Sequence, residues 1–247
     1  MESTKSIIIF IGIMTSLVAV GLTGMRQSTA PIAEKNEDVF NKRAILSSVK
    51  NYLEKPLGEY SDNEVLSIFE KDVKQYALDM NGNVLSEKPG IADQIDMAKE
   101  AKKPEDQRIL PLYVYDSPEG TFYILSVRGR GLWDAIWGTV ALKEDLLTVA
   151  GASFDHAGET PGLGAEIKDN PVFAAQFSDK KIFDYNGEYK AVVVRKGGAR
   201  NPVYEVDGIS GATVTADGVT EMLQRGMKYY EPYLSPLRGE VKVEVKG

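Results

Sequence analysis

The chain has 247 residues, of which 43% are hydrophobic, so it can bury one full core but leaves little room for two large domains. Its 29 basic and 36 acidic residues give a formal net charge of −7, and no dense cluster of Lys or Arg marks a surface for a phosphate backbone, so nucleic acid is not an expected partner. The absence of cysteine excludes disulfides, iron–sulfur clusters and thiolate zinc sites.

An uncharged, mostly apolar run occupies residues 7–25. It is long enough to cross a bilayer, which takes about 20 residues. A cleavable signal peptide is the alternative, because residues 28–30, Ser-Thr-Ala, resemble a small-residue cleavage site. The run exceeds the roughly 7–15 apolar residues of a usual signal core, and Pro31 would directly follow the cut. We therefore expect a retained single transmembrane helix, with residues 1–30 forming the anchor and its linker.

The orientation of this anchor depends on basic residues at both of its ends. Lys5 and the amino terminus precede the apolar run, whereas Arg26 and Lys35 follow it. The positive-inside rule therefore gives only a small preference for a soluble part outside the cytoplasm.

The region from residue 31 to residue 107 is expected to form a helical and irregular first part of the soluble domain. Residues 26–36 are polar, contain a proline and are interpreted as a linker. Helical spacing of apolar residues predicts a helix over residues 37–53, capped by Asn36, and a second helix that starts at the Ser-Asp-Asn-Glu of residues 61–64 and continues to Tyr76. Residues 80–107 are rich in charges and are interpreted as turns or a surface insertion.

Residues 108–247 are expected to form the main part of the soluble domain, which opens with strands. Residues 109–115 and 122–127 are rich in aromatic and β-branched side chains and are separated by a Ser-Pro-Glu-Gly turn, so they are expected to pair. Further strands are predicted at residues 138–142, 146–154, 189–195 and 201–206, and a helix is predicted to open at Asn170-Pro171. These proportions predict an α+β fold with a mostly antiparallel sheet and packed helices.

The segment of residues 207–215 lies between a predicted strand and a strongly helical pattern. Thr215 is well placed to cap that helix, so residues 210–213 would form a compact turn ahead of a helix N-terminus. Free backbone amides and the helix dipole make such a position suitable for a phosphate, and the turn carries the hydroxyl of Thr213. The alternative is an ordinary glycine-containing turn with an N-cap.

The string Asp207-Gly208-Ile209-Ser210-Gly211-Ala212-Thr213 resembles the flavinylation motif of the FMN-binding domain family, which ends in Ser/Thr-Gly-Ala-Thr. The resemblance implies that Thr213 receives FMN through a phosphoester on its side-chain oxygen. Asp207 opens the motif, Ser210 occupies its hydroxyl position, and Gly211 and Ala212 are the small residues beside the acceptor.

A second segment, Glu159-Thr160-Pro161-Gly162-Leu163-Gly164, resembles a loop that the same family places against the flavin. Pro161 and Gly162 predict a type II turn here, and such a turn could at the same time contact the flavin. His156 with Asp155 and Glu159 could suggest a metal site. Because His156 is the one histidine of the chain, a metal site is not expected.

A third segment, residues 129–142, holds both tryptophans of the chain. Core packing is the ordinary role of a tryptophan, and flavin contact is the alternative considered for Trp133. The Gly-x-Gly-Leu-Trp string resembles the C subunit of the sodium-translocating NADH:quinone oxidoreductase more than the related G subunit of the Rnf complex. The resemblance covers residues 108–230 and the anchor.

The resemblance implies a membrane-anchored electron-transfer flavoprotein with one covalent FMN and no catalytic acid or base. It also implies the NADH-oxidising and quinone-reducing subunits of a redox complex as partners, a flavin transferase for maturation, and a soluble domain on the periplasmic side of a bacterial inner membrane. An Rnf-type subunit that couples ferredoxin and NAD is one alternative. A non-redox, membrane-anchored binding module is another.

Overall fold

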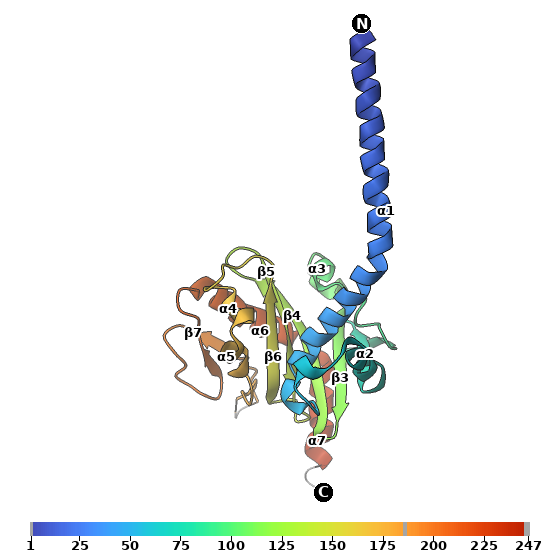
Figure 1. The fold of residues 1–247 in the computed structure, drawn as a ribbon. Helices are drawn as coiled ribbons and strands as arrows, with labels where there is room; N and C mark the ends of the chain where they lie inside the picture. The colour runs from blue at the N-terminus through green and yellow to red at the C-terminus, as the bar shows by residue number, and fades with distance from the viewer. Residues whose placement is uncertain (1, 185–186, 245–247) are drawn as a thin grey trace. The chain divides into compact units, whose positions relative to one another are not determined.

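The structure, a computed structural model, describes residues 2–184 and 187–244 (Figure 1). The chain divides into an N-terminal unit that ends at Lys42 and a second unit that begins at Arg43. A single long helix, α1 (Glu2–Ser47), supplies the first unit and the opening residues of the second. Among the described residues, α1 is the one helix long and apolar enough to cross a membrane.

The prediction of a linker at residues 26–36 is wrong, because these residues lie within α1. Pro31 removes one backbone donor from the helix, at a cost of about 3 kcal/mol in a helix interior. Its neighbours Ala30, Ala33 and Glu34 favour helix strongly, and the helix continues through the proline. Asn36 consequently lies inside the helix and caps nothing.

The second unit is built on a six-stranded sheet in the order β2-β1-β3-β4-β5-β6, in which all neighbours are antiparallel. Its strands are β1 (Val73–Leu78), β2 (Val84–Glu87), β3 (Leu110–Ser117), β4 (Gly120–Arg130), β5 (Ala135–Leu142) and β6 (Val149–His156). The predicted pairing of residues 109–115 with 122–127 is confirmed, since Tyr113 of β3 lies opposite Ile124 of β4. The α+β class with a mostly antiparallel sheet is therefore confirmed.

The helices and short 3-10 turns of this unit precede β1, lie between β2 and β3, or follow β6. They are α2 (Asp62–Lys71), α3 (Met97–Glu100), α4 (Glu166–Asp169), α5 (Pro171–Ala175), α6 (Thr213–Lys228) and α7 (Glu231–Glu244), with 3-10 turns at Lys50–Tyr52, Leu57–Glu59 and Glu105–Gln107. The predicted start of α2 is confirmed by reciprocal hydrogen bonds between Ser61 and Glu64, and the predicted start of α5 is confirmed by the Asn170 side chain, which accepts from the Val172 amide.

Two strands arise where the sequence predicted none. Residues 73–76 were expected to continue the second helix, but α2 ends at Lys71 and residues 73–78 form β1, with buried and exposed side chains alternating along much of its length. The expected surface insertion at residues 80–107 contains β2, which pairs with β1 at the edge of the sheet. The first part of the second unit therefore contributes strands to the main sheet as well as helices.

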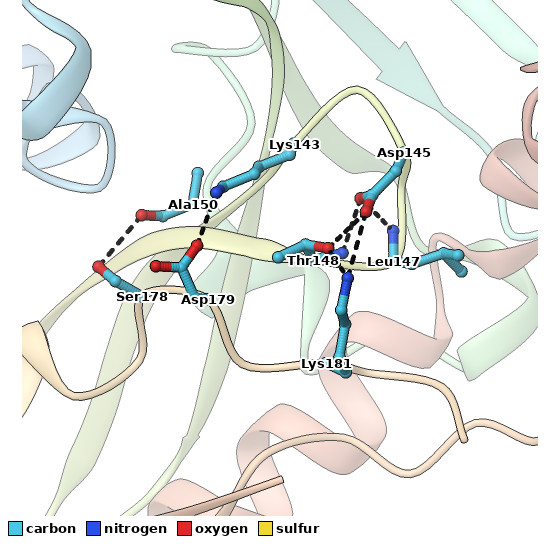
Figure 2. A network of polar contacts seen from close by, with 8 residues as sticks. All are labelled: Lys143, Asp145, Leu147, Thr148, Ala150, Ser178, Asp179 and Lys181. Carbon is cyan, nitrogen blue, oxygen red and sulfur yellow. Dashed lines mark hydrogen bonds and ion pairs between the residues drawn. The ribbon is translucent and has the colours of Figure 1, made fainter. Parts of the chain in front are cut away.

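A small second sheet pairs β7 (Val193–Arg195) with β8 (Glu205–Asp207). Both strands are shorter than predicted and the pair is parallel. The strand predicted from residue 146 also starts later, because Asp145 accepts the amides of Leu147 and Thr148 at 2.9 and 2.8 Å and folds them into a turn before β6 (Figure 2).

Figure 2 shows how this turn is tied to the chain that follows α5. The Lys181 ammonium lies 3.5 Å from the Asp145 carboxylate and also donates to the Thr148 hydroxyl. On the same side, Lys143 contacts Asp179 at 2.6 Å. These contacts fix the segment that leads from the main sheet towards β7.

Helix α6 packs against β4 and lies behind the sheet in Figure 1. The buried side chains between them include Leu125 and Val127 of the sheet and Val219, Met222 and Leu223 of the helix. Near the N-terminus of α6, a Cβ atom on Gly218 would lie 2.2 Å from the Arg130 carbonyl oxygen, so only glycine permits this close approach. The start of α6 is thereby brought to the end of β4.

Candidate functional site

The loop after β6 forms the predicted type II turn. The Leu163 amide donates to the Thr160 carbonyl at 3.1 Å, Pro161 occupies the second turn position, and Gly162 has a φ of 74°. A positive φ at the third position is the mark of this turn and favours glycine. The turn presents Leu163 at the surface, where 41% of the side chain is exposed.

Helix α6 begins at Thr213, with Ala212 as its N-cap and no side-chain capping hydrogen bond. The prediction that Thr215 caps this helix is wrong. Thr215 is the third residue of the helix, is 1% exposed, and donates its hydroxyl hydrogen to Oε2 of Glu159 at 2.5 Å. An ionised carboxylate is a strong acceptor for a hydroxyl hydrogen, so the Thr215 side chain is directed inwards to Glu159.

No side chain caps the amides that open α6. The first intrahelical bond joins the Ala216 amide to the Ala212 carbonyl, and within residues 2–184 and 187–244 the amides of Thr213, Val214 and Thr215 have no acceptor. Together with the positive end of the helix dipole, three open donors form a position suited to a phosphate. Thr213 is partly exposed there, and its hydroxyl makes no hydrogen bond to any of these described residues.

A cavity of about 130 Å³ lies in front of these amides. It brings together residues from three segments of the chain: Leu132, Glu159, Thr160, Leu163, Gly164, Gly211, Ala212, Thr213, Val214 and Thr215. Most of the predicted site residues therefore meet, although the loop of Thr160 and the turn of Thr213 are about fifty residues apart in sequence.

Four predicted residues do not line this cavity. Gly162, Asp207 and Ser210 line a neighbouring cavity of about 290 Å³, and Trp133 lines neither of the two. Asp207 there has a local role, because its carboxylate accepts the Ala199 amide at 2.7 Å. Asp207 and Ser210 of the motif therefore belong to the segment that leads into α6 and do not line the cavity in front of the helix.

Glu159 is the buried acid of the site, with 4% of its surface exposed. Its Oε1 accepts the Trp133 amide at 2.9 Å, and its Oε2 accepts the Thr215 hydroxyl. Burial alone would raise the pKa of this carboxyl, but the hydrogen bonds from Thr215 and from the amides of Trp133 and Asp134 outweigh burial and lower it. Glu159 is therefore ionised at neutral pH.

Two glycines leave just enough space for this carboxylate. A Cβ on Gly131 would lie 2.5 Å from Oε1, and a Cβ on Gly164 would lie 2.3 Å from Oε2. On the backbone side, the Glu159 amide donates to Nδ1 of His156 at 3.1 Å. His156 thus supports the turn that holds Glu159.

Large apolar side chains surround the cavity and are open to solvent. Leu132, Trp133 and Val214 are 50%, 65% and 52% exposed, and Leu163 stands beside them. The expected core packing of Trp133 is wrong, since its ring lies at the surface with Nε1 donating to the Thr160 hydroxyl at 3.2 Å. Leu132 and Val214 escaped prediction, and their position directly beside the motif residues was the available signal.

The model of the FMN-binding domain family matches residues 131–228, a range that holds all three segments of the site. The C subunit of the Na(+)-translocating NADH-quinone reductase from Pseudomonas aeruginosa is 30% identical, over 96% of this chain and 97% of the relative. The corresponding C subunit of Pasteurella multocida is 28% identical, over 96% and 95%.

Two crystal structures of such subunits have the same fold. That of the C subunit from Parabacteroides distasonis superposes with a TM-score of 0.70 and 35% identity, covering 82% of this chain and 95% of the other. That of the Shewanella oneidensis protein NqrC gives a TM-score of 0.69 and 26% identity, covering 84% and 99%. On the fold, on the site and on similarity along nearly its whole length, the chain belongs to the family of C subunits of the Na(+)-translocating NADH-quinone reductases.

Proposed function

We propose that this chain carries FMN as a phosphoester of Thr213 and passes electrons between the other subunits of a sodium-pumping NADH:quinone oxidoreductase. The observation that carries the proposal is the difference between two threonines at the start of α6. Thr215 is buried and its hydroxyl is taken by Glu159, whereas Thr213 is partly exposed beside three open amides. A phosphate on Thr213 would meet those amides and the positive end of the helix.

The dimensions of the site fit a phosphate seat with the flavin outside it. A cavity of about 130 Å³ is smaller than the roughly 300–1,000 Å³ of pockets that enclose a whole ligand. The exposed side chains of Leu132, Trp133, Leu163 and Val214 offer an apolar surface for the rest of the molecule. FMN supplies one- and two-electron chemistry when bound, and the task of these residues is to hold it and to exclude water.

Attachment needs an activated flavin, because a phosphate monoester does not condense with a hydroxyl in water. A flavin adenine dinucleotide meets this need. The Thr213 oxygen forms a bond to the flavin-side phosphorus, the pyrophosphate bond breaks, AMP leaves with the electron pair, and the hydroxyl proton passes to a base. We assign that base to a separate flavin transferase, because no side chain of this chain accepts the Thr213 hydroxyl hydrogen within the described residues.

The same proposal places the chain at the inner membrane. Helix α1 has the length and composition of a single span. Anchoring would keep the flavin-bearing unit beside membrane partners, and we propose the periplasmic side for it. The partners are the NADH-oxidising and quinone-reducing subunits of the complex.

The test is the position of the flavin on the full chain produced together with a flavin transferase. We expect peptide mapping to find the FMN mass on Thr213 and expect Thr213→Ala to lose covalent flavin completely. Because the Thr213 hydroxyl makes no hydrogen bond within the described residues, this variant should unfold at the same temperature as the unmodified wild type. Thr213→Ser retains a hydroxyl and serves as the matched control. An adduct on Ser210 or Thr215, with Thr213 unmodified, would show the assignment to be wrong.

A further inference from the structure

Three segments that are distant in sequence meet at one carboxylate. Glu159 joins the loop after β4, through the Trp133 amide, to the first turn of α6, through the Thr215 hydroxyl. A side chain at position 131 or 164 would collide with this carboxylate, and both positions are glycine. The Glu159 carboxylate therefore links the β4–β5 loop, the turn after β6 and the start of α6.

We propose that Glu159 is a positioning residue for flavin attachment: by holding Thr215 it fixes the first turn of α6, so that Thr213 is presented to the transferase and Thr215 is withheld. The inference rests on the proposed function of Thr213. Glu159 lines the cavity, but its oxygens are directed to protein donors. Its effect on attachment therefore passes through Thr215.

Helix geometry supports this division of roles. Residues two positions apart on an α-helix are rotated by about 200° around the helix axis, so Thr213 and Thr215 point to nearly opposite sides of α6. Fixing Thr215 on the buried side consequently directs Thr213 towards the open side. A threonine in a helix otherwise divides between two side-chain rotamers, and a single strong acceptor selects one of them.

The chemistry of the acceptor also matters. Both oxygens of an ionised carboxylate accept, and here Oε1 takes the Trp133 amide and Oε2 the Thr215 hydroxyl. A glutamine at position 159 has the same shape but one acceptor oxygen. If that oxygen keeps the Trp133 amide, the amide nitrogen faces Thr215, whose hydroxyl would then have to accept, and a weaker neutral hydrogen bond would replace the charge-assisted one. Glu159→Gln thus changes the hydrogen bonding of the site while conserving its volume.

The experiment measures the initial rate of FMN incorporation into the full chain in the presence of the transferase and flavin adenine dinucleotide. Intact mass follows the adduct, at a temperature well below the unfolding midpoint of every variant. We expect Glu159→Gln and Thr215→Val each to lower the rate about ten-fold, which a loss of about 1.4 kcal/mol produces. The double variant should lose no more than Thr215→Val alone, because both substitutions act on the same hydrogen bond, which Glu159→Gln weakens and Thr215→Val removes.

Two further variants separate positioning from general stability. Thr215→Ser keeps the hydroxyl and should retain nearly the wild-type rate. Asp169→Asn removes one exposed carboxylate from α4, a few residues after the turn, and should leave the rate unchanged. In all variants that react, the adduct should stay on Thr213.

The outcomes distinguish this inference from the function on which it rests. If the wild type carries FMN on Thr213 and Glu159→Gln reacts at the wild-type rate, the positioning role is overturned and the proposed function stands. Additive losses in the double variant would overturn the coupling through Thr215. A wild type without FMN on Thr213 would instead overturn the proposed function itself.

Discussion

Gly164 is the residue at which the site has least room. A Cβ at this position would lie 2.3 Å from Oε2 of Glu159 and 2.7 Å from the Thr215 hydroxyl oxygen. We predict that Gly164→Ala lowers the free energy of unfolding by about 1–3 kcal/mol, the usual cost of overpacking. Thermal unfolding of the unmodified chain in detergent measures it. Gly158→Ala is the control, since its Cβ would meet its nearest neighbour, in Asp134, at 4.0 Å. Equal midpoints for the two variants would contradict the prediction.

For single residues, the predictions were correct where the conformation depends on neighbours in the chain. The turn around Pro161 and Gly162 follows from the conformations that these two residues prefer, and it was predicted correctly. The role of Thr215 was not, because the N-cap preference is local whereas its true acceptor, Glu159, lies 56 residues away. The exposure of Trp133 was missed for a related reason, since a tryptophan is ordinarily buried and only the folded site shows it at the surface.

Strand β8 begins with an acid that closes the loop from β7. Glu205 accepts from the Arg195 guanidinium at 2.5 Å and from the amides of Arg200 and Asn201 at 2.7 and 3.0 Å. The hydrogen bond from Arg195, followed by those from the two amides, lowers the pKa of Glu205 from 4.5 to about 2. A carboxyl whose pKa is lower in the folded chain stabilises the fold above its unfolded pKa, and this contribution is lost as the pH falls through the folded value.

We therefore predict that Glu205→Gln lowers the unfolding temperature at pH 7 and that the difference from the wild type shrinks as the pH falls from about 4.5 towards about 2. Thermal unfolding at several pH values measures this difference. Glu119→Gln in the β3–β4 turn, where the residue is exposed, controls for the loss of one charge. A difference that stays constant over the acid range would refute the role of the ionised carboxylate.

Whole elements were predictable where apolar patterning was strong. Strands β3 and β4 carry continuous aromatic and β-branched residues, and their pairing was predicted. Strand β2 could not be recognised, because it is a four-residue edge strand with no buried side chain and hence no alternation. At β1, the spacing of Val73 and Tyr76 continued the helical spacing of α2, and only pairing with β3 decides for a strand.

For the molecule as a whole, we propose that the apolar segment of α1 anchors the protein in the membrane. Deleting residues 2–30 removes the apolar span and leaves the entire second unit intact. We predict that this shortened chain is recovered folded in the soluble fraction, whereas the full chain stays with the membrane after a carbonate wash. N-terminal sequencing of the full chain supplies the complementary measurement. A mature protein that starts at or near Pro31 would show that the segment is a removed signal.

The uncapped start of α6 illustrates a trade-off between stability and use. Ala212 stands where Ser, Thr, Asp or Asn would stabilise the helix by about 1 kcal/mol. A side-chain cap would occupy the same amides that a phosphate needs. The unmodified chain thus forgoes a local gain in stability, and a phosphate on Thr213 would itself supply the missing cap. If Thr213 carries FMN as proposed, attachment of the cofactor would also supply the hydrogen bonds that the start of α6 lacks.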